Sequence, residues 1–127
     1  TVDVTRVSYS PLGAGRLTGK SPSGAMPEGS RAAVDKATGG QGNLGGRKTD
    51  RGVAAAEAYG RLAAEHGWDV VHMVIAWQLT RPFEVVPIIG ATTMDQLRHL
   101  IAGLDRDLPD ELRRGIERLH RAHPLPY

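Results

Sequence analysis

The 127-residue sequence contains no cysteine, and only 5% of its residues are aromatic. Without cysteine the chain can form neither disulfides nor zinc-thiolate sites, and it has no cysteine nucleophile. No stretch approaches the roughly 20 apolar residues that span a bilayer, and the first six residues lack the basic-then-apolar order of a signal peptide. We therefore expect a cytoplasmic protein with no membrane partner.

Charge of one sign is also scarce, because 16 basic residues against 14 acidic ones leave a formal charge of +2. An excess this small cannot form a stripe that follows a phosphate backbone, so we expect no nucleic-acid partner. The 24% charged and 40% hydrophobic residues are ordinary for a globular domain. The length suits one domain, but a complete (β/α)₈ barrel needs roughly 250 residues and is excluded.

The chain begins with a predicted strand and a long loop. Residues 2–10 are rich in β-branched side chains and stop at Pro11. Residues 21–52 are crowded with glycine, proline, serine and charge, which predicts a mobile loop. Residues 53–66 then have apolar residues at helical spacing and end at Gly67, a residue suited to a left-handed cap.

A second helix is predicted after Asp69, whose carboxylate can cap it, and Pro82 forbids its continuation. One core-facing stripe is expected along this helix: Val70, Met73, Val74, Trp77 and Gln78. The last helix is predicted over 109–121, with proline at its start, acidic residues in its first turn and three apolar residues on one face: Leu112, Ile116 and Leu119.

Between these helices lies a second predicted strand. Residues 83–89 are almost wholly apolar, as in strands buried on both faces of a parallel sheet, although Pro87 removes one ladder donor. Thr93 and Gln96 then form the pattern of a capping box that opens a helix. The succession predicts an α/β fold with two parallel strands, whose edges would both lack partners.

Two other chemistries are not supported by the spacing of the residues. Residues 14–21 fit a relaxed phosphate-loop pattern, but the helix that such a loop requires is ruled out by the prolines and glycine at 22–27. A nucleotide triphosphatase is therefore not favoured. The acidic residues at 105–111 have no metal-ligand spacing, and the histidines other than His99 are interpreted as structural: His66, His72, His120 and His123. We expect no metal site.

The segments Ser8–Lys20 and Pro87–Leu97 together resemble the aldo-keto reductases, most closely the bacterial, potassium-channel β-subunit-like branch. The resemblance covers almost the whole chain and implies the C-terminal β/α units of a TIM (β/α)₈ barrel, incomplete in this chain. It divides the chain into consecutive parts: strand seven with its turn (1–20), the mobile loop (21–52), a helix pair (53–81), strand eight with the cofactor-binding helix (83–103) and a C-terminal helix (109–121).

The resemblance implies NADPH as cofactor, bound across the carboxyl ends of the strands. Tyr9 would stack on the nicotinamide, a task that suits a flat amphipathic ring. Ser10, Leu12 and Gly13 match the turn that lies along the pyrophosphate and ribose, where small residues let backbone amides approach.

The adenosine 2′-phosphate would be received by the second turn. Gly90, Ala91 and Thr92 match the loop that holds it at a helix N-terminus, and Gln96 faces the same site one turn on. The next helical turn departs from the family, which has an acidic residue and an asparagine for the adenine where this chain has His99 and Leu100. Leucine cannot form that hydrogen bond.

The implied activity is NADPH-dependent reduction of aldehydes and ketones to alcohols, an oxidoreductase reaction. In the family a tyrosine tuned by lysine, with histidine and aspartate nearby, supplies the proton. All four lie ahead of the matching positions, so no catalytic residue is assigned and the chain alone is not expected to turn over. The alternative is a noncatalytic NADPH-binding or regulatory module that assembles with itself or with the N-terminal half of a barrel.

Overall fold

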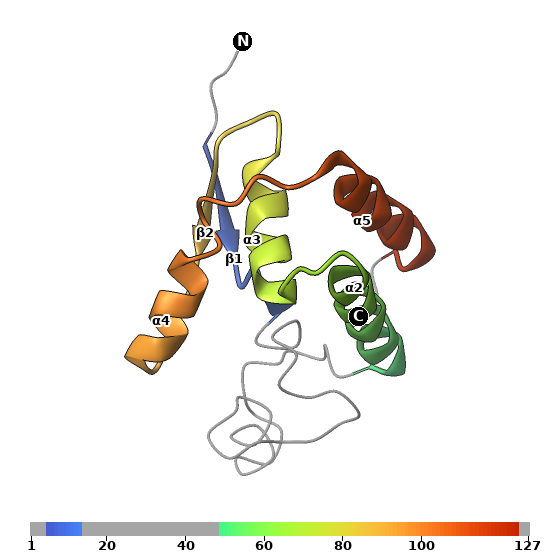
Figure 1. The fold of residues 1–127 in the computed structure, drawn as a ribbon, viewed down its shortest axis with the longest axis horizontal. Helices are drawn as coiled ribbons and strands as arrows, with labels where there is room; N and C mark the ends of the chain where they lie inside the picture. Colours follow the sequence, from blue (N-terminus) through green and yellow to red (C-terminus); the bar gives the residue numbers. More distant parts are fainter. Residues whose placement is uncertain (1–4, 14–48, 125–127) are drawn as a thin grey trace.

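The computed structural model describes residues 5–13 and 49–124, within which helices pack beside a two-stranded sheet (Figure 1). The order of elements is β1 (Arg6–Tyr9), α2 (Asp50–Glu65), α3 (Val70–Leu79), β2 (Val85–Ile88), α4 (Met94–Ile101) and α5 (Asp110–Ala122). This is the predicted succession for the described part of the chain. Most of the predicted loop at 21–52 and the phosphate-loop-like residues 14–21 lie outside the described residues.

The two strands form a parallel sheet, as predicted. Arg6 pairs with Val85 at one end of the register and Tyr9 pairs with Ile88 at the other. The chain crosses from β1 to β2 through α2 and α3, and α3 packs directly on β2. Because the strands are parallel, both of their carboxyl ends lie at the same edge of the sheet.

Helix α2 begins three residues earlier than predicted, at Asp50 rather than residue 53. The Thr49 side chain accepts a hydrogen bond from the backbone N–H of Gly52 at 2.9 Å and so caps the helix. The prediction was wrong here because the capping residues follow a glycine-rich stretch. The far end is as expected, since Gly67 has the left-handed φ of 66° after α2 ends.

Helix α3 begins as predicted, because Asp69 Oδ1 accepts hydrogen bonds from the first amides of the helix. Its burial differs from the single predicted stripe. Met73 packs with Leu112 in one core cluster, whereas Val71 and Ile75 pack in another. Helix α3 lies between the sheet and the α2–α5 pair (Figure 1), so it buries two sides rather than one.

Strand β2 is not buried on both faces, contrary to the prediction. Val86 is 46% exposed and Ile88 is 49% exposed, and their partners on β1, Val7 and Tyr9, are 63% and 70% exposed. These four side chains share the face of the sheet away from α3, which we call the open face. The apolar run predicted double burial, but within the described residues a second covering layer is absent from this face.

The last two helices pack against the earlier helices. Leu100 is the buried side chain of α4 and packs with the α3 cluster. Helix α5 presents Leu112 and Ile116 to the core shared with α2, as the sequence predicted. Among the described residues, each helix is too short or too polar to cross a membrane.

Candidate functional site

The predicted cofactor residues lie on two loops that leave the sheet at the same edge. Tyr9 ends β1 and pairs with Ile88, which ends β2. The turn at residues 10–13 and the loop at 89–93 therefore begin from adjacent positions, although they are far apart in the sequence. Loops at the carboxyl edge of a parallel sheet are the usual location of ligand sites in α/β proteins.

The first turn has an unusual backbone. Ser10 has a φ of 51°, a left-handed conformation that residues other than glycine seldom adopt, and Gly13 has a φ of 58°. The backbone N–H of Gly13 donates to the Ser10 carbonyl oxygen at 2.9 Å and closes the turn. Leu12 packs against the cluster around Val71 and anchors it. Such conformations persist where the surroundings enforce them, and they are frequent at ligand sites.

Tyr9 lies at the carboxyl end of β1 on the open face of the sheet. Its side chain is well exposed, like that of Val7 two residues earlier on the same face. The ring is therefore accessible to a ligand from the side opposite α3. A large exposed aromatic ring beside a strained turn is an arrangement suited to stacking.

The second loop folds over its own helix. Thr93 caps α4 by accepting the Gln96 N–H at 3.2 Å, as predicted. Gln96 Oε1 accepts from the Thr92 N–H at 2.9 Å and from Thr92 Oγ1 at 3.0 Å. The predicted capping box is thus half wrong, because Gln96 reaches one residue beyond the cap and holds the loop rather than the Thr93 amide.

This arrangement fixes how Gln96 is oriented. Because Oε1 takes both bonds from Thr92, the Nε2 group faces away from that residue with its N–H donors. The loop also ends at the N-terminus of α4, where amides and the helix dipole favour an anion. Asp95 in the first turn opposes an anion, but Arg98 lies 3.3 Å from its carboxylate and offsets the charge.

The two residues at the predicted adenine position are occupied elsewhere. Leu100 is only 5% exposed and lies in the core beneath α4. His99 extends towards α3, where its Nε2 lies 3.3 Å from Asp69 Oδ1. Neither side chain is therefore placed to bind an adenine, in line with the departure from the family pattern that the sequence shows here.

Sequence reasoning missed one cluster of potential ligands. Asp69, His72 and His99 come together where α3 meets α4. The sequence predicts Asp69 only as a helix cap and His72 only as a structural residue, and His99 lies 27 residues after His72. The i, i+3 spacing of Asp69 and His72 on one helix was the available signal, since such residues share a face.

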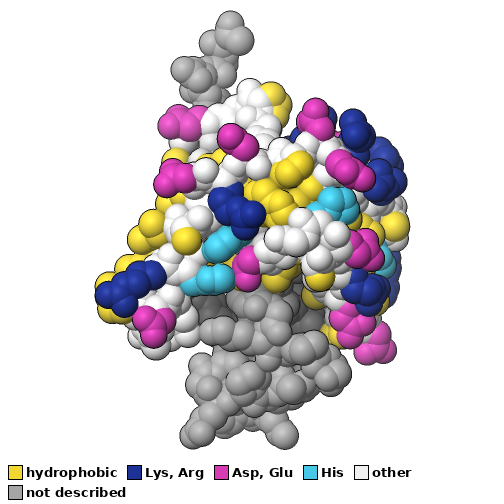
Figure 2. Space-filling view, in the orientation of Figure 1, with side chains coloured by type: hydrophobic (Ala, Val, Ile, Leu, Met, Phe, Trp, Pro, Cys, Tyr) yellow, Lys and Arg dark blue, Asp and Glu magenta, His cyan; other side chains and the backbone are white. Residues whose placement is uncertain are grey.

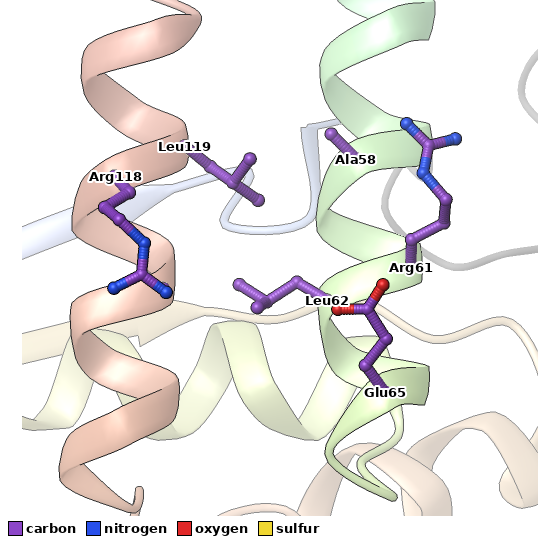
Figure 3. Close-up of a pocket in the computed structure, with 7 residues that line it drawn as sticks. Ala58, Arg61, Leu62, Glu65, Arg118 and Leu119 are labelled. Carbon is purple, nitrogen blue, oxygen red and sulfur yellow. The ribbon is translucent and has the colours of Figure 1, made fainter.

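A shallow groove of about 230 Å³ lies elsewhere, between α2 and α5 (Figure 3). Small residues, leucines and charged residues line it: Ala58, Arg61, Leu62, Glu65, Gly115, Arg118 and Leu119. None of the predicted cofactor residues lines this groove, so it is separate from the site at the sheet edge.

Comparisons with known proteins bear on this geometry. The family model described as aldo/keto reductase family matches residues 2–121. Protein tas of Escherichia coli (strain K12) is 36% identical over 124 residues, which are 97% of this chain and 34% of that protein, and protein tas of Shigella flexneri gives the same values. An aldo-keto reductase of Fusarium vanettenii is 27% identical over 77 residues, 61% of this chain and 20% of that protein. The chain thus spans about a third of the length of the tas proteins.

Proposed function

This chain belongs to the aldo-keto reductase family, as its sequence predicted, and from that premise we propose that it is the C-terminal, NADP(H)-binding portion of a reductase of aldehydes and ketones. The family fold is a TIM barrel, and we assign β1 and β2 to its seventh and eighth strands. The observation that carries the proposal is the meeting of the 10–13 turn and the 89–93 loop at one edge of the sheet. A dinucleotide that crosses this edge can touch both.

The open face supports the assignment to an incomplete barrel. In a (β/α)₈ barrel, helices cover the outside of the strands and the other face fills the interior. Helix α3 covers one face of the β1–β2 sheet, whereas Val7 and Val86 on the other face are exposed in the described structure. Further strands of a barrel would bury them. The same face also supports the alternative, a noncatalytic module whose open face is covered by a second copy.

The 2′-phosphate of NADPH is assigned to the second loop. The Nε2 group of Gln96 would donate to it, and Thr92 would hold Gln96 in this orientation through its two hydrogen bonds. The small residues Gly90 and Ala91 would let backbone amides approach. The N-terminus of α4 adds a favourable partial positive charge. Gln96 fits a phosphate, since its acceptor Oε1 is already satisfied within the loop and its Nε2 donors remain for a ligand.

The nicotinamide end is assigned to the first turn. Tyr9 would stack on the ring, and Ser10, Leu12 and Gly13 would line the pyrophosphate and ribose. When bound, NADPH supplies the hydride that reduces a carbonyl. The residues of this chain would bind and orient the cofactor, and we assign none of them as the proton donor.

The adenine end fits less well. Leu100 is buried and has no polar side-chain group, and His99 contacts Asp69. We therefore propose that affinity rests on the phosphates and on stacking with Tyr9, with little hydrogen bonding to the adenine base. Selectivity for NADPH over NADH would then depend on Thr92 and Gln96.

The test is a titration of the chain with NADPH and NADH, followed by tyrosine and tryptophan fluorescence. Gln96→Ala should weaken NADPH by about tenfold or more, because a hydrogen bond to a charged group contributes about 1.5–3 kcal/mol. Thr92→Ala should also weaken NADPH, because it removes one of the two hydrogen bonds that orient Gln96. NADH should weaken much less. Thr80→Ala, at the C-cap of α3, is the matched control and should change neither affinity. Equal losses for the two cofactors would refute the phosphate assignment.

Tyr9 offers a second test. Tyr9→Phe keeps a flat ring and should retain affinity, whereas Tyr9→Ala should lose the stacking contribution, about 0.5–1.5 kcal/mol or a two- to tenfold loss. Assay of the purified chain with NADPH and an aldehyde should give no turnover, and robust turnover without a partner would contradict the proposal. Analytical ultracentrifugation tests the alternative, which requires stable association.

A further inference from the structure

A group of metal-binding side chains lies on the helical surface where the start of α3 meets α4, and Figure 2 shows histidine side chains beside an acidic one in this region. Asp69, His72 and His99 each offer one ligand atom, and these atoms lie within 4.8 Å of one another. His99 Nε2 is 3.3 Å from Asp69 Oδ1. The rings of His72 and His99 have centroids 4.6 Å apart.

The proton on His72 can be assigned from its partner. Its Nε2 lies 2.7 Å from the carbonyl oxygen of His99, which can only accept, so Nε2 carries the hydrogen. In the neutral ring Nδ1 then has a free lone pair that can bind a metal. Histidines at metal centres are usually oriented in this way, by donating the other ring N–H to a carbonyl or carboxylate.

The backbone around His72 is shaped to fit the ring. A Cβ at position 103 would lie 2.8 Å from His72 Cδ2 and 3.1 Å from its Cα, so the His72 ring has its present space because residue 103 is glycine. The hydrogen bond to the His99 carbonyl holds the same side of the ring. His72 is therefore positioned by two features of α4 and the turn that follows it.

The distances suit a small tetrahedral ion. Ligands that bind Zn²⁺ at 2.0–2.1 Å lie about 3.3–3.4 Å from each other. Asp69 and His99 already have this separation, and a ring nitrogen of His72 lies within 4.8 Å of both ligand atoms. The His99 and Asp69 side chains are 48% and 40% exposed, so an ion can enter from solvent and keep water as a fourth ligand.

We propose that Asp69, His72 and His99 form a binding site for a divalent transition metal, with Zn²⁺ as the preferred ion. Two imidazole nitrogens with one carboxylate suit zinc and its neighbours, whereas Mg²⁺ and Ca²⁺ prefer oxygen ligands. The capping bonds of Asp69 use Oδ1, so Oδ2 adds a second oxygen to the same carboxylate. The ion would join α3 to α4 across the covered side of the sheet.

The experiment is isothermal titration of the tag-free chain with Zn²⁺, together with Co²⁺ absorption as a report of tetrahedral coordination. We expect one ion per chain. His72→Gln and His99→Gln should each lower the affinity for Zn²⁺ by more than about 100-fold. Loss of a residue that only hydrogen-bonds to a metal ligand typically costs about 10- to 100-fold, and these residues would be ligands themselves. Asp69→Asn should also lower it while keeping α3 folded, because asparagine caps helices as well as aspartate does. His120→Gln, an exposed histidine on α5, is the control and should bind normally.

Several outcomes would overturn the site. One is failure of the chain to bind Zn²⁺ at micromolar concentration while circular dichroism shows that its helices are intact. Another is equal binding by the urea-unfolded chain or by the His72→Gln, His99→Gln double variant, since scattered histidines would then explain the signal. A loss in the His120→Gln control as large as in the site variants would have the same meaning.

Discussion

The two faces of the small parallel sheet differ in how completely they are packed. On one side, α3 lies against the strands and α2 and α5 lie beyond it (Figure 1). Met73, Ile75 and Leu112 on these helices have no exposed surface. On the other side, the open face carries Val7 and Val86 with about half or more of their surface exposed. Within the described residues, the covered side is closely packed and the open face is exposed.

The covered side stabilises the fold, whereas the candidate binding residues lie at the edge of the sheet and on the open face. The helices bury enough apolar surface to hold the strands in register, and the register brings the two loops together at one edge. The candidate cofactor residues lie at that edge and on the open face, where Tyr9 remains accessible. Substitutions on the covered side should therefore act on folding, and those on the open face should act on binding or assembly.

The largest expected effect is on the covered side. Leu112→Ala removes a fully buried side chain from the cluster that joins α2, α3 and α5. We expect a loss of about 2–5 kcal/mol in the free energy of unfolding, because the substitution removes buried apolar atoms and leaves a cavity. Urea denaturation followed by circular dichroism measures it. Val86→Ala on the open face is the partner substitution and should cost about 0.5 kcal/mol.

The comparison would break if Val86→Ala were as costly as Leu112→Ala. The open face would then be covered in solution, and ultracentrifugation of the same sample should reveal an associated species. A small cost for both substitutions would instead mean that the helical core is not formed in the isolated chain.

A smaller effect is expected where α3 meets the end of α4. Gly103→Ala places a Cβ 2.8 Å from the His72 ring and 3.1 Å from its backbone, which cannot move aside. We expect a destabilisation of about 1–3 kcal/mol. Gly60→Ala is the matched control, because its Cβ meets nothing within 4 Å in the middle of α2 and should stabilise by about 0.5–1 kcal/mol. Thermal denaturation measures both variants. If Gly103→Ala changed the stability as Gly60→Ala does, α4 would not be docked on α3.

The same contrast explains how much of the structure the sequence predicted. Helix ends were predictable because their signals are local: Gly67 adopts the expected left-handed φ, and the Asp69 side chain caps α3. The succession of strands and helices followed from apolar spacing in the same way. The prediction failed at Asp50, where the capping residues continue a glycine-rich stretch.

Burial was predicted less well, because it depends on what packs around an element. The apolar run at 83–89 is typical of a strand covered on both faces, yet Val86 is half exposed in the described residues. Helix α3 was expected to bury one stripe and buries two sides. The cluster of Asp69, His72 and His99 arises only when α4 docks on α3, so spacing along the sequence could indicate only its Asp69–His72 pair.

Asp69 both caps α3 and belongs to this cluster. Asp69→Ala removes the acceptor of two α3 amides and should cost about 0.5–2 kcal/mol. Asp69→Asn keeps a capping oxygen and should cost only a few tenths of a kcal/mol, by analogy with other strong caps. If the two variants were equally destabilised in urea, the charge interaction with His99 rather than the cap would be the stabilising term.

The smallest expected effect is a pH dependence on the covered side. Burial raises the pKa of Tyr59, which packs against the α2–α5 core, above its usual value near 10. The unfolded chain therefore loses this proton at a lower pH than the folded chain, so the contribution of Tyr59 is complete below about pH 10 and declines as the pH rises beyond it. Tyr59→Phe cannot ionise, and its free energy of unfolding should fall less steeply than that of the original chain between about pH 9 and 11. Tyr9→Phe, on the open face, is the control. If the two substitutions changed the slope equally, burial of Tyr59 on the covered side would not be the cause of the pH dependence.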